Sequence, residues 1–318
     1  MKNTKKMQTP LREIIPEKSK TSLAYLIIFI LGAGFLLIAF LYLISGIVFP
    51  SVFDKCIAVV EINGELHSDD IPATIFSNEV LGSESIALKI SEIEGRPDIG
   101  AVVLIVNSPG GSVVATREIY AAYKSLSIPK VAYFREVAAS GGYYIATPSD
   151  YIISEPYAIT GSIGVISQSV EFSGLMKNLG INATTIKSGV NKDLGSQTTP
   201  MSEEQKEILQ GISNEVFMDF KSVILENRKE KLDMASFEEV LDARIMLGTQ
   251  AKKIGLIDGL GTKKDAINKA AELAGIEGEP RICKISIGEQ KTSLFDVAGF
   301  FRGFFYSSNS YGLKYLAG

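Results

Sequence analysis

The chain has 318 residues, of which 46% are hydrophobic, and its formal net charge is −4. This length allows one large domain or two smaller ones, and the mild acidity gives no basis for nucleic acid binding, which uses basic surfaces. The single histidine, His67, excludes most histidine-based metal sites, and Cys56 and Cys283 are too few for a disulfide framework or a metal cluster. Whether these two cysteines pair is left open.

A long uncharged stretch near the N-terminus predicts a membrane anchor. Residues 21–53 contain no charged side chain, and a bilayer-spanning helix takes about 20 apolar residues. We predict an uncleaved signal anchor, because a cleaved signal peptide has a shorter apolar core and small residues at its exit. Basic residues predominate before the stretch and acidic residues after it, so the positive-inside rule places the N-terminus in the cytoplasm. The expected segments are a cytoplasmic tail (1–21), a transmembrane anchor (22–49), a linker (50–56), an extracytoplasmic domain (57–285) and a C-terminal segment (286–318).

Strands and helices alternate after the anchor. Strands are predicted at 57–64, 101–106, 131–134, 151–154 and 183–186, and helices at 84–94, 113–126, 141–147, 170–179 and 201–228. Unbroken apolar strands that alternate with helices are typical of an α/β fold with a parallel sheet. We therefore predict one α/β domain.

Ser140 lies where the strand ending near Phe134 gives way to a helix. Free N–H groups at a helix start can stabilise an oxyanion, so a serine at this position can act as a nucleophile. The alternative is that Ser140 only caps the helix, since serine is a favoured N-cap residue.

Two glycine-rich turns follow consecutive strands, Pro109-Gly110-Gly111 and Ser140-Gly141-Gly142. Open α/β sheets place their sites at the carboxyl ends of strands. The glycines could merely relieve tight turns. The same form on two neighbouring strands favours an oxyanion hole in which the N–H groups of Gly111 and Gly141 are the donors.

A serine nucleophile needs a base, and the residues alone leave three candidates. His67 has the right chemistry but lies in an acidic turn region. Lys187 and Lys192 occupy a polar loop, where a lysine could serve as base if burial lowered its pKa. A solvated loop lysine is the plainer interpretation of each, and spacing does not choose between them.

Four motifs in order resemble the signal peptide peptidase A family of membrane-anchored serine proteases, the S49 type. They are Asn107-Ser108-Pro109-Gly110-Gly111-Ser112, Ala139-Ser140-Gly141-Gly142, Thr160-Gly161-Ser162-Ile163-Gly164 and Lys187-Ser188-Gly189 with Lys192-Asp193-Leu194-Gly195-Ser196. The resemblance implies a crotonase/Clp protease-like fold built from ββα units. It implies Ser140 as nucleophile, Lys192 as general base, Ser162 as the residue that orients the lysine, and Gly111 and Gly141 as the oxyanion hole.

The single copy of these motifs resembles the short form of the family, which implies a homo-oligomeric ring whose dyad is shared between protomers. The implied function is degradation of cleaved signal peptides and similar hydrophobic peptides at the outer face of the cytoplasmic membrane, next to the lipid bilayer, without cofactor or metal. Alternatives are a related protease acting on membrane-protein tails, a non-proteolytic acyl-CoA enzyme, and an inactive scaffold on the same fold.

The C-terminal segment allows two further hypotheses. The aromatic residues between 295 and 306 favour core packing in the ring, with contact at the membrane interface as the alternative. The small and apolar residues of the last six positions, 313–318, allow this end to occupy the peptide groove.

Overall fold

The computed structural model describes residues 20–48, 55–72, 80–285 and 314–316. The chain divides into two compact units, Met1–Asp54 and Lys55–Gly318. The aromatic segment at 295–306 and the basic residues before position 20 lie outside the described residues.

The first unit contains one described helix, α1 (Lys20–Val48). Its side chains are described from residue 25 to residue 41; they are uncharged, and nearly all of these residues are exposed, as Phe29 (74%) and Phe35 (73%) illustrate. Among the residues that were described in full, no helix combines the length and the apolar character needed to cross a membrane.

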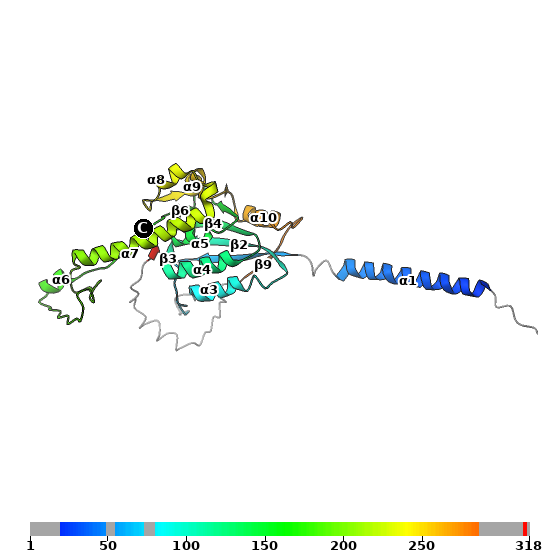
Figure 1. The fold of residues 1–318 in the computed structure, drawn as a ribbon, viewed down its shortest axis with the longest axis horizontal. Helices are drawn as coiled ribbons and strands as arrows, with labels where there is room; N and C mark the ends of the chain where they lie inside the picture. The colour runs from blue at the N-terminus through cyan, green and yellow to red at the C-terminus, as the bar shows by residue number, and fades with distance from the viewer. Residues whose placement is uncertain (1–19, 49–54, 73–79, 286–313, 317–318) are drawn as a thin grey trace, which may run out of the picture. The chain divides into compact units, whose positions relative to one another are not determined.

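The second unit is built on a mostly parallel sheet (Figure 1). Its strands run in the order β7-β6-β4-β2-β1-β9, while β5 pairs with the first half of β4 and with β8; only the β6–β7 pair is antiparallel. The strands are β1 (Cys56–Asn63), β2 (Ile99–Ser108), β4 (Lys130–Ala139), β5 (Tyr151–Ser154), β6 (Ile159–Gly161), β7 (Ile245–Leu247), β8 (Gly259–Leu260) and β9 (Arg281–Lys284). A separate two-stranded pair joins β3 (Gly110–Ser112) to β10 (Lys314–Leu316).

Helices cover both faces of this sheet because its apolar strands must be buried on both sides. Alternate side chains of β1 and β2 enter two separate cores, one shared with α3, α4, α5 and α7 and the other with α10. The helices are α3 (Ser83–Ser91), α4 (Val113–Ser125), α5 (Gly141–Ala146), α6 (Ser173–Asn178), α7 (Glu203–Arg228), α8 (Met234–Glu239), α9 (Gly248–Ile254) and α10 (Lys263–Leu273), with a 3₁₀ turn at Lys229–Lys231.

The segment between β6 and α7 projects from the sheet as an arm, which we define as residues 166–202. In Figure 1, α6 lies beyond the N-terminal end of α7 and far from α5. Its apolar side chains are unusually exposed: Ile186 is 96% exposed and Val190 is 71% exposed. The strand predicted at 183–186 is wrong, because the described residues offer this segment no strand with which to pair.

The α/β class is confirmed, and the sheet is consistent with the Clp protease-like fold that the motifs imply. The strand predicted at 131–134 is longer in the structure. Strand β4 continues five residues beyond Phe134 to Ala139, because its second half leaves β5 and pairs with β6. The strand therefore delivers the chain directly to Ser140.

The two cysteines form a disulfide between neighbouring parallel strands. Cys56 at the start of β1 and Cys283 in β9 have Cα atoms 5.8 Å apart and are separated by 227 residues in sequence. The bond joins the two ends of the α/β domain, where β1 enters the sheet and β9 closes it.

Candidate active site

Ser140 occupies a strained corner between β4 and α5. Its backbone has φ 52° and ψ −122°, a combination that costs a non-glycine residue about 1–3 kcal/mol. The residue is fully buried, and its Oγ has no hydrogen-bond partner within the described residues. The side chain makes no capping hydrogen bond to α5, so the plain N-cap interpretation does not describe this serine.

Strand β6 holds the corner from one side. The Ser140 N–H donates to the carbonyl of Gly161 at 2.8 Å, and the next residue, Ser162, is itself nearly buried with φ 50°. The Ser162 N–H donates to the Arg244 carbonyl at 2.9 Å. The fold thus brings two serines, 22 positions apart in sequence, to adjacent ends of paired strands.

Close packing explains the glycine that follows Gly141. A Cβ on Gly142 would lie 2.5 Å from the Ser108 carbonyl oxygen at the end of β2. The first turn of α5 can therefore approach β2 only with glycine at this position. The predicted donor Gly141 lies at the first residue of α5, next to Ser140.

The other predicted donor, Gly111, lies in β3 rather than in a loop. On one edge of β3, Leu66 donates to Gly110 at 2.8 Å and accepts from Ser112 at 2.9 Å. Because backbone groups alternate along a strand, the Gly111 N–H points to the opposite edge. A Cβ on Gly111 would lie 2.3 Å from the Leu66 carbonyl oxygen, so this close approach also requires glycine.

That opposite edge of β3 carries the C-terminal strand of the same chain. β10 runs antiparallel to β3, with Tyr315 opposite Gly111 and Leu316 opposite Gly110. The edge that exposes the predicted oxyanion donor is therefore one that accepts an extended peptide.

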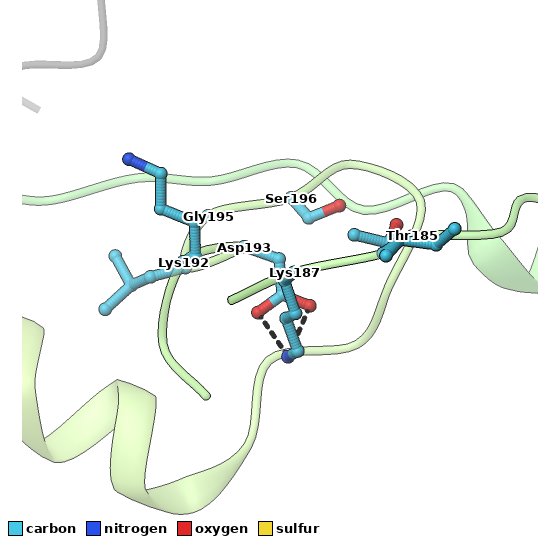
Figure 2. Close-up of a pocket in the computed structure, with 8 residues that line it drawn as sticks. Thr185, Lys187, Lys192, Asp193, Gly195 and Ser196 are labelled. Atoms are coloured by element: carbon cyan, nitrogen blue, oxygen red, sulfur yellow. Dashed lines mark hydrogen bonds and ion pairs between the residues drawn. The ribbon is translucent and has the colours of Figure 1, made fainter. Parts of the chain in front are cut away.

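The two candidate lysines have different environments. Lys187 Nζ forms an ion pair with both oxygens of Asp193, at 2.7 and 2.8 Å, and donates to the Val190 carbonyl (Figure 2). Lys192 is exposed, and within the described part of the chain its ammonium makes no ion pair or hydrogen bond. Figure 2 shows its side chain directed away from the Lys187–Asp193 pair.

Both lysines line a cavity of about 320 Å³ on the arm, and Ser140 is not among its lining residues. Ser140 is buried at the end of β4, whereas Lys192 is exposed between α6 and α7. The structure places Ser162 and Gly141 next to Ser140, and β3, which carries Gly111, contacts α5. Among the described residues, no contact joins Lys192 to Ser140.

His67, the third candidate base, lies one residue after Leu66, which forms a bridge with Gly111. It is half-buried, and its carbonyl accepts a hydrogen bond from the Ser83 N–H at 2.8 Å. The histidine thus lies near the donor strand, although no contact joins its side chain to Ser140 among the described residues.

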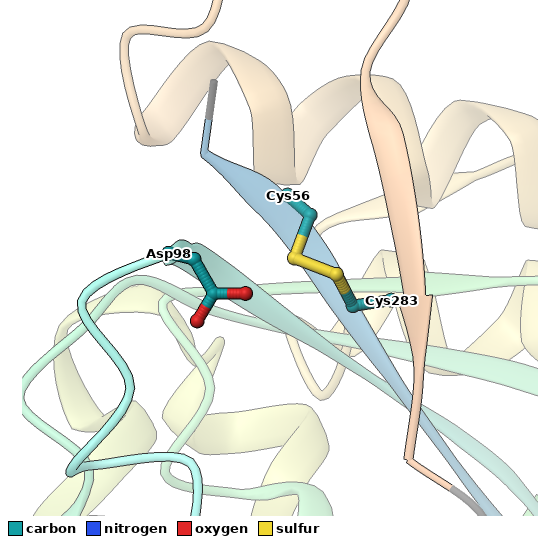
Figure 3. A group of neighbouring side chains, drawn as sticks. All are labelled: Cys56, Asp98 and Cys283. Atoms are coloured by element: carbon teal, nitrogen blue, oxygen red, sulfur yellow. A yellow bond between two sulfur atoms is a disulfide. The ribbon is translucent and has the colours of Figure 1, made fainter. Parts of the chain in front are cut away.

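Cys56, Asp98 and Cys283 form a cluster in which the potential ligand atoms lie within 4.8 Å of one another (Figure 3). Metal binding by cysteine requires the thiolate. The two sulfur atoms are bonded to each other, so this cluster does not fit a metal site in its oxidised form.

Sequence reasoning missed Asp193 and Gln205 as a pair. The Asp193 carboxylate, only 9% exposed, also accepts a hydrogen bond from Gln205 Nε2 at 3.0 Å. The hydrogen bond from the Lys187 ammonium, and to a smaller extent the one from Gln205, holds the pKa of Asp193 below its usual range. The three-residue spacing of Ser202 and Gln205, which is typical of a capping box at a helix start, was a sequence signal for the position of Gln205.

Comparison with known proteins identifies relatives of this chain. The profile of Peptidase family S49 matches residues 122–277. A protein of Methanocaldococcus jannaschii, provisionally named as a protease, is 40% identical over 204 residues, which are 64% of this chain and 65% of that protein.

Two further relatives match over more of their own length. A protein of Enterococcus faecium, provisionally named signal peptide peptidase SppA, is 33% identical over 78% of this chain and 69% of its own. A provisionally named protease of Synechocystis sp. is 35% identical over 70% of this chain and 76% of its own.

Proposed function

Because the chain belongs to peptidase family S49, and so to a family of proteases, we propose that it is a membrane-anchored serine endopeptidase. Its nucleophile is Ser140 and its general base is Lys192. Its substrates are cleaved signal peptides and similar hydrophobic peptides at the outer face of the cytoplasmic membrane.

The observation that carries this proposal is the conformation of Ser140. A buried hydroxyl that has no hydrogen-bond partner in the described part of the chain, held at a strained corner, is costly unless the surrounding structure maintains it for a purpose. Gly141 follows Ser140 at the first residue of α5, and α5 contacts β3, the strand that carries Gly111. These are the requirements of a nucleophile and an oxyanion hole.

The mechanism needs only residues of the protein and water. Neutral Lys192 accepts the Ser140 proton while Oγ attacks the peptide carbonyl, and the N–H groups of Gly111 and Gly141 stabilise the oxyanion. The lysine then passes the proton to the leaving amine. Water attacks the resulting acyl-enzyme with the same lysine as base. Ser162, next to the corner, orients the lysine.

The arrangement of the chain supports a dyad shared between protomers. Lys192 is exposed on the arm, and Ser140 is buried in the core of the same chain. The exposed apolar side chains of the arm, such as Ile186 and Val190, are of the kind that protein interfaces cover. In a homo-oligomeric ring the arm delivers Lys192 to the Ser140 of a neighbour.

Lys187 is unsuited to the role of base. Its nitrogen is already engaged by both oxygens of Asp193 and by the Val190 carbonyl, and these contacts hold it away from any substrate or nucleophile.

Two observations support a position outside the cytoplasm. Residues 21–53 are uncharged and follow a basic segment, which is the pattern of a signal anchor with the N-terminus inside. The Cys56–Cys283 disulfide is a feature of proteins in oxidising compartments.

A peptide-accepting edge at β3 suits an extended substrate, since pairing with the main chain places few demands on the side chains of the substrate.

The test is a peptidase assay on the full-length protein in detergent, with hydrophobic signal-peptide sequences as substrates. Ser140→Ala and Lys192→Ala should each lower kcat by at least about 10³-fold, while Ser125→Ala, an exposed serine on α4, should leave it unchanged. Full activity of Ser140→Ala would overturn the mechanism. Comparison of signal peptides with membrane-protein tails as substrates separates the two protease alternatives.

Complementation tests the shared dyad. Neither Ser140→Ala nor Lys192→Ala should be active alone, but a mixed ring would pair an intact Ser140 with an intact Lys192 from different chains. Co-expression of the two variants should restore a substantial fraction of the activity. No recovery in mixed oligomers verified by differential tags would place the dyad within one chain.

A further inference from the structure

Asp193 connects two segments of the arm to the first turn of α7. Its carboxylate accepts two hydrogen bonds from Lys187 Nζ and one from Gln205 Nε2. Lys187 follows the extended segment after α6, Asp193 belongs to the turn that carries Lys192, and Gln205 lies in the first turn of α7. One nearly buried carboxylate therefore fixes the turn to the long helix.

Each partner of Asp193 is itself held in place. Gln205 is 6% exposed, and its Oε1 accepts from the Ser202 N–H at 3.1 Å in the capping box that begins α7. Lys187 Nζ also donates to the Val190 carbonyl at 2.8 Å, which ties it to the start of the same turn. The cluster is thus anchored to a helix at one end and closes the turn at the other.

The turn leaves its central residues little freedom. Its N–H groups donate to carbonyls three residues earlier, from Lys192 to Gly189 at 3.2 Å, from Leu194 to Asn191 at 3.1 Å and from Ser196 to Asp193 at 2.8 Å. With Asp193 fixed on one side, the adjacent Lys192 side chain is directed to the other side (Figure 2).

We propose that Asp193 is a positioning residue, which with Lys187 and Gln205 clamps the turn so that Lys192 is presented as the catalytic base. Asp193 also balances the charge of Lys187, a second ammonium beside the same cavity as Lys192. The inference rests on the proposed role of Lys192, and it assigns to Lys187 a structural and electrostatic role in place of a catalytic one.

The test compares Asp193→Asn, Lys187→Gln and the double variant in the full-length protein. We expect each single variant to lower kcat about 10- to 100-fold, with KM changed less than twofold, because the base is misplaced while the peptide-binding edge is intact. Glu203→Gln is the matched control, since it breaks an exposed ion pair with Lys206 in the first turn of α7 and should leave kcat unchanged.

The acid limb of the kcat/KM profile gives a readout that a purely structural role would not move. In Asp193→Asn the unbalanced Lys187 ammonium disfavours a second charge on Lys192, so the limb should move to lower pH. In Lys187→Gln the unbalanced Asp193 carboxylate should move it to higher pH, and the double variant should return it towards the wild-type position. Limbs that stay fixed in both single variants would refute the electrostatic role.

Lys192→Ala separates this inference from the function on which it rests. If Lys192→Ala retains activity, the proposed base is wrong. If Lys192→Ala is inactive while Asp193→Asn and Lys187→Gln have wild-type kcat, the base stands and the positioning role is refuted. Size-exclusion chromatography and thermal unfolding of each variant identify losses that arise from assembly or folding, and partial recovery in Asp193→Glu supports the clamp.

Discussion

The Ser140 N–H donates a hydrogen bond to the Gly161 carbonyl at 2.8 Å, and this bond joins the ends of strands β4 and β6. It places Ser140 and Ser162, both with positive φ, on either side of one peptide contact. The pairing of the two strand ends maintains the strained backbone at each serine, because neither end can relax without breaking that pairing.

Ser162→Ala should lower kcat about 10- to 100-fold while KM stays within about twofold. In the proposed mechanism this hydroxyl orients the lysine and takes no part in peptide binding, so the loss should belong to the chemical step. Steady-state kinetics with a hydrophobic peptide measures this split. Ser162→Thr should recover part of the activity, and a Ser162→Ala enzyme with unchanged kcat would remove Ser162 from the site.

Gly111→Ala should abolish activity and destabilise the fold. The new Cβ would lie 2.3 Å from the Leu66 carbonyl oxygen, so β3 must move and carry its N–H away from the oxyanion. Loss of one oxyanion donor costs roughly 10²- to 10³-fold in kcat. Gly95→Ala is the control, since a Cβ there meets nothing within 4 Å. Activity and chemical unfolding are measured for both variants.

Removal of residues 314–318 should raise kcat/KM for added peptides, by about 3- to 10-fold. β10 occupies the β3 edge at Gly111, so a substrate must displace it before pairing there. Tyr315→Pro is the sharper variant, because proline lacks the N–H used in strand pairing and the length of the chain is kept. Equal kcat/KM in wild type and both variants would show that β10 does not compete with substrate.

The stability of the domain should fall in acid through Asp258. Burial alone raises the pKa of this carboxyl, but hydrogen bonds and charge from Arg228, together with the Ile152 N–H and Lys231, hold it below its usual value. Because the folded pKa is depressed, the stabilisation is present above the unfolded pKa of about 3.9 and is lost as pH falls through the folded pKa.

Asp258→Asn should cost roughly 3 kcal/mol at pH 7, since it leaves the buried Arg228 without its counter-charge. The variant should also show a smaller loss of stability between pH 5 and pH 3 than the wild type. Asp98→Asn, which breaks the exposed Arg96 pair, should cost less than about 1 kcal/mol. Denaturant unfolding at several pH values tests both.

Reduction of the Cys56–Cys283 disulfide should destabilise the domain by roughly 3–5 kcal/mol, because the bond closes a loop of more than 200 residues in the unfolded chain. The measurement is thermal unfolding with and without reductant. The double variant Cys56→Ala with Cys283→Ala should be less stable than the oxidised wild type, both with and without reductant, and its stability should not respond to reductant. A wild-type unfolding temperature that reductant leaves unchanged would contradict the stabilising role.

The α/β class and the position of Ser140 could be predicted before the fold was known, because both depend on local patterns of residues. Apolar runs of strand length, helical spacing and glycines at strand ends occur within about ten residues of one another. The same local signals led to a wrong prediction in the arm, where a strand was expected at 183–186. Strand-like composition does not form a strand unless another strand lies beside it.

Features that depend on contacts between distant parts of the chain became visible in the folded protein. The pairing of Cys56 with Cys283 spans 227 residues, and the ion pair between Lys187 and Asp193 had no counterpart in the sequence-based predictions. The placement of β10 against Gly111 joins residues about 200 positions apart. Residue spacing along a chain cannot specify such contacts, because the path of the intervening chain sets which side chains meet.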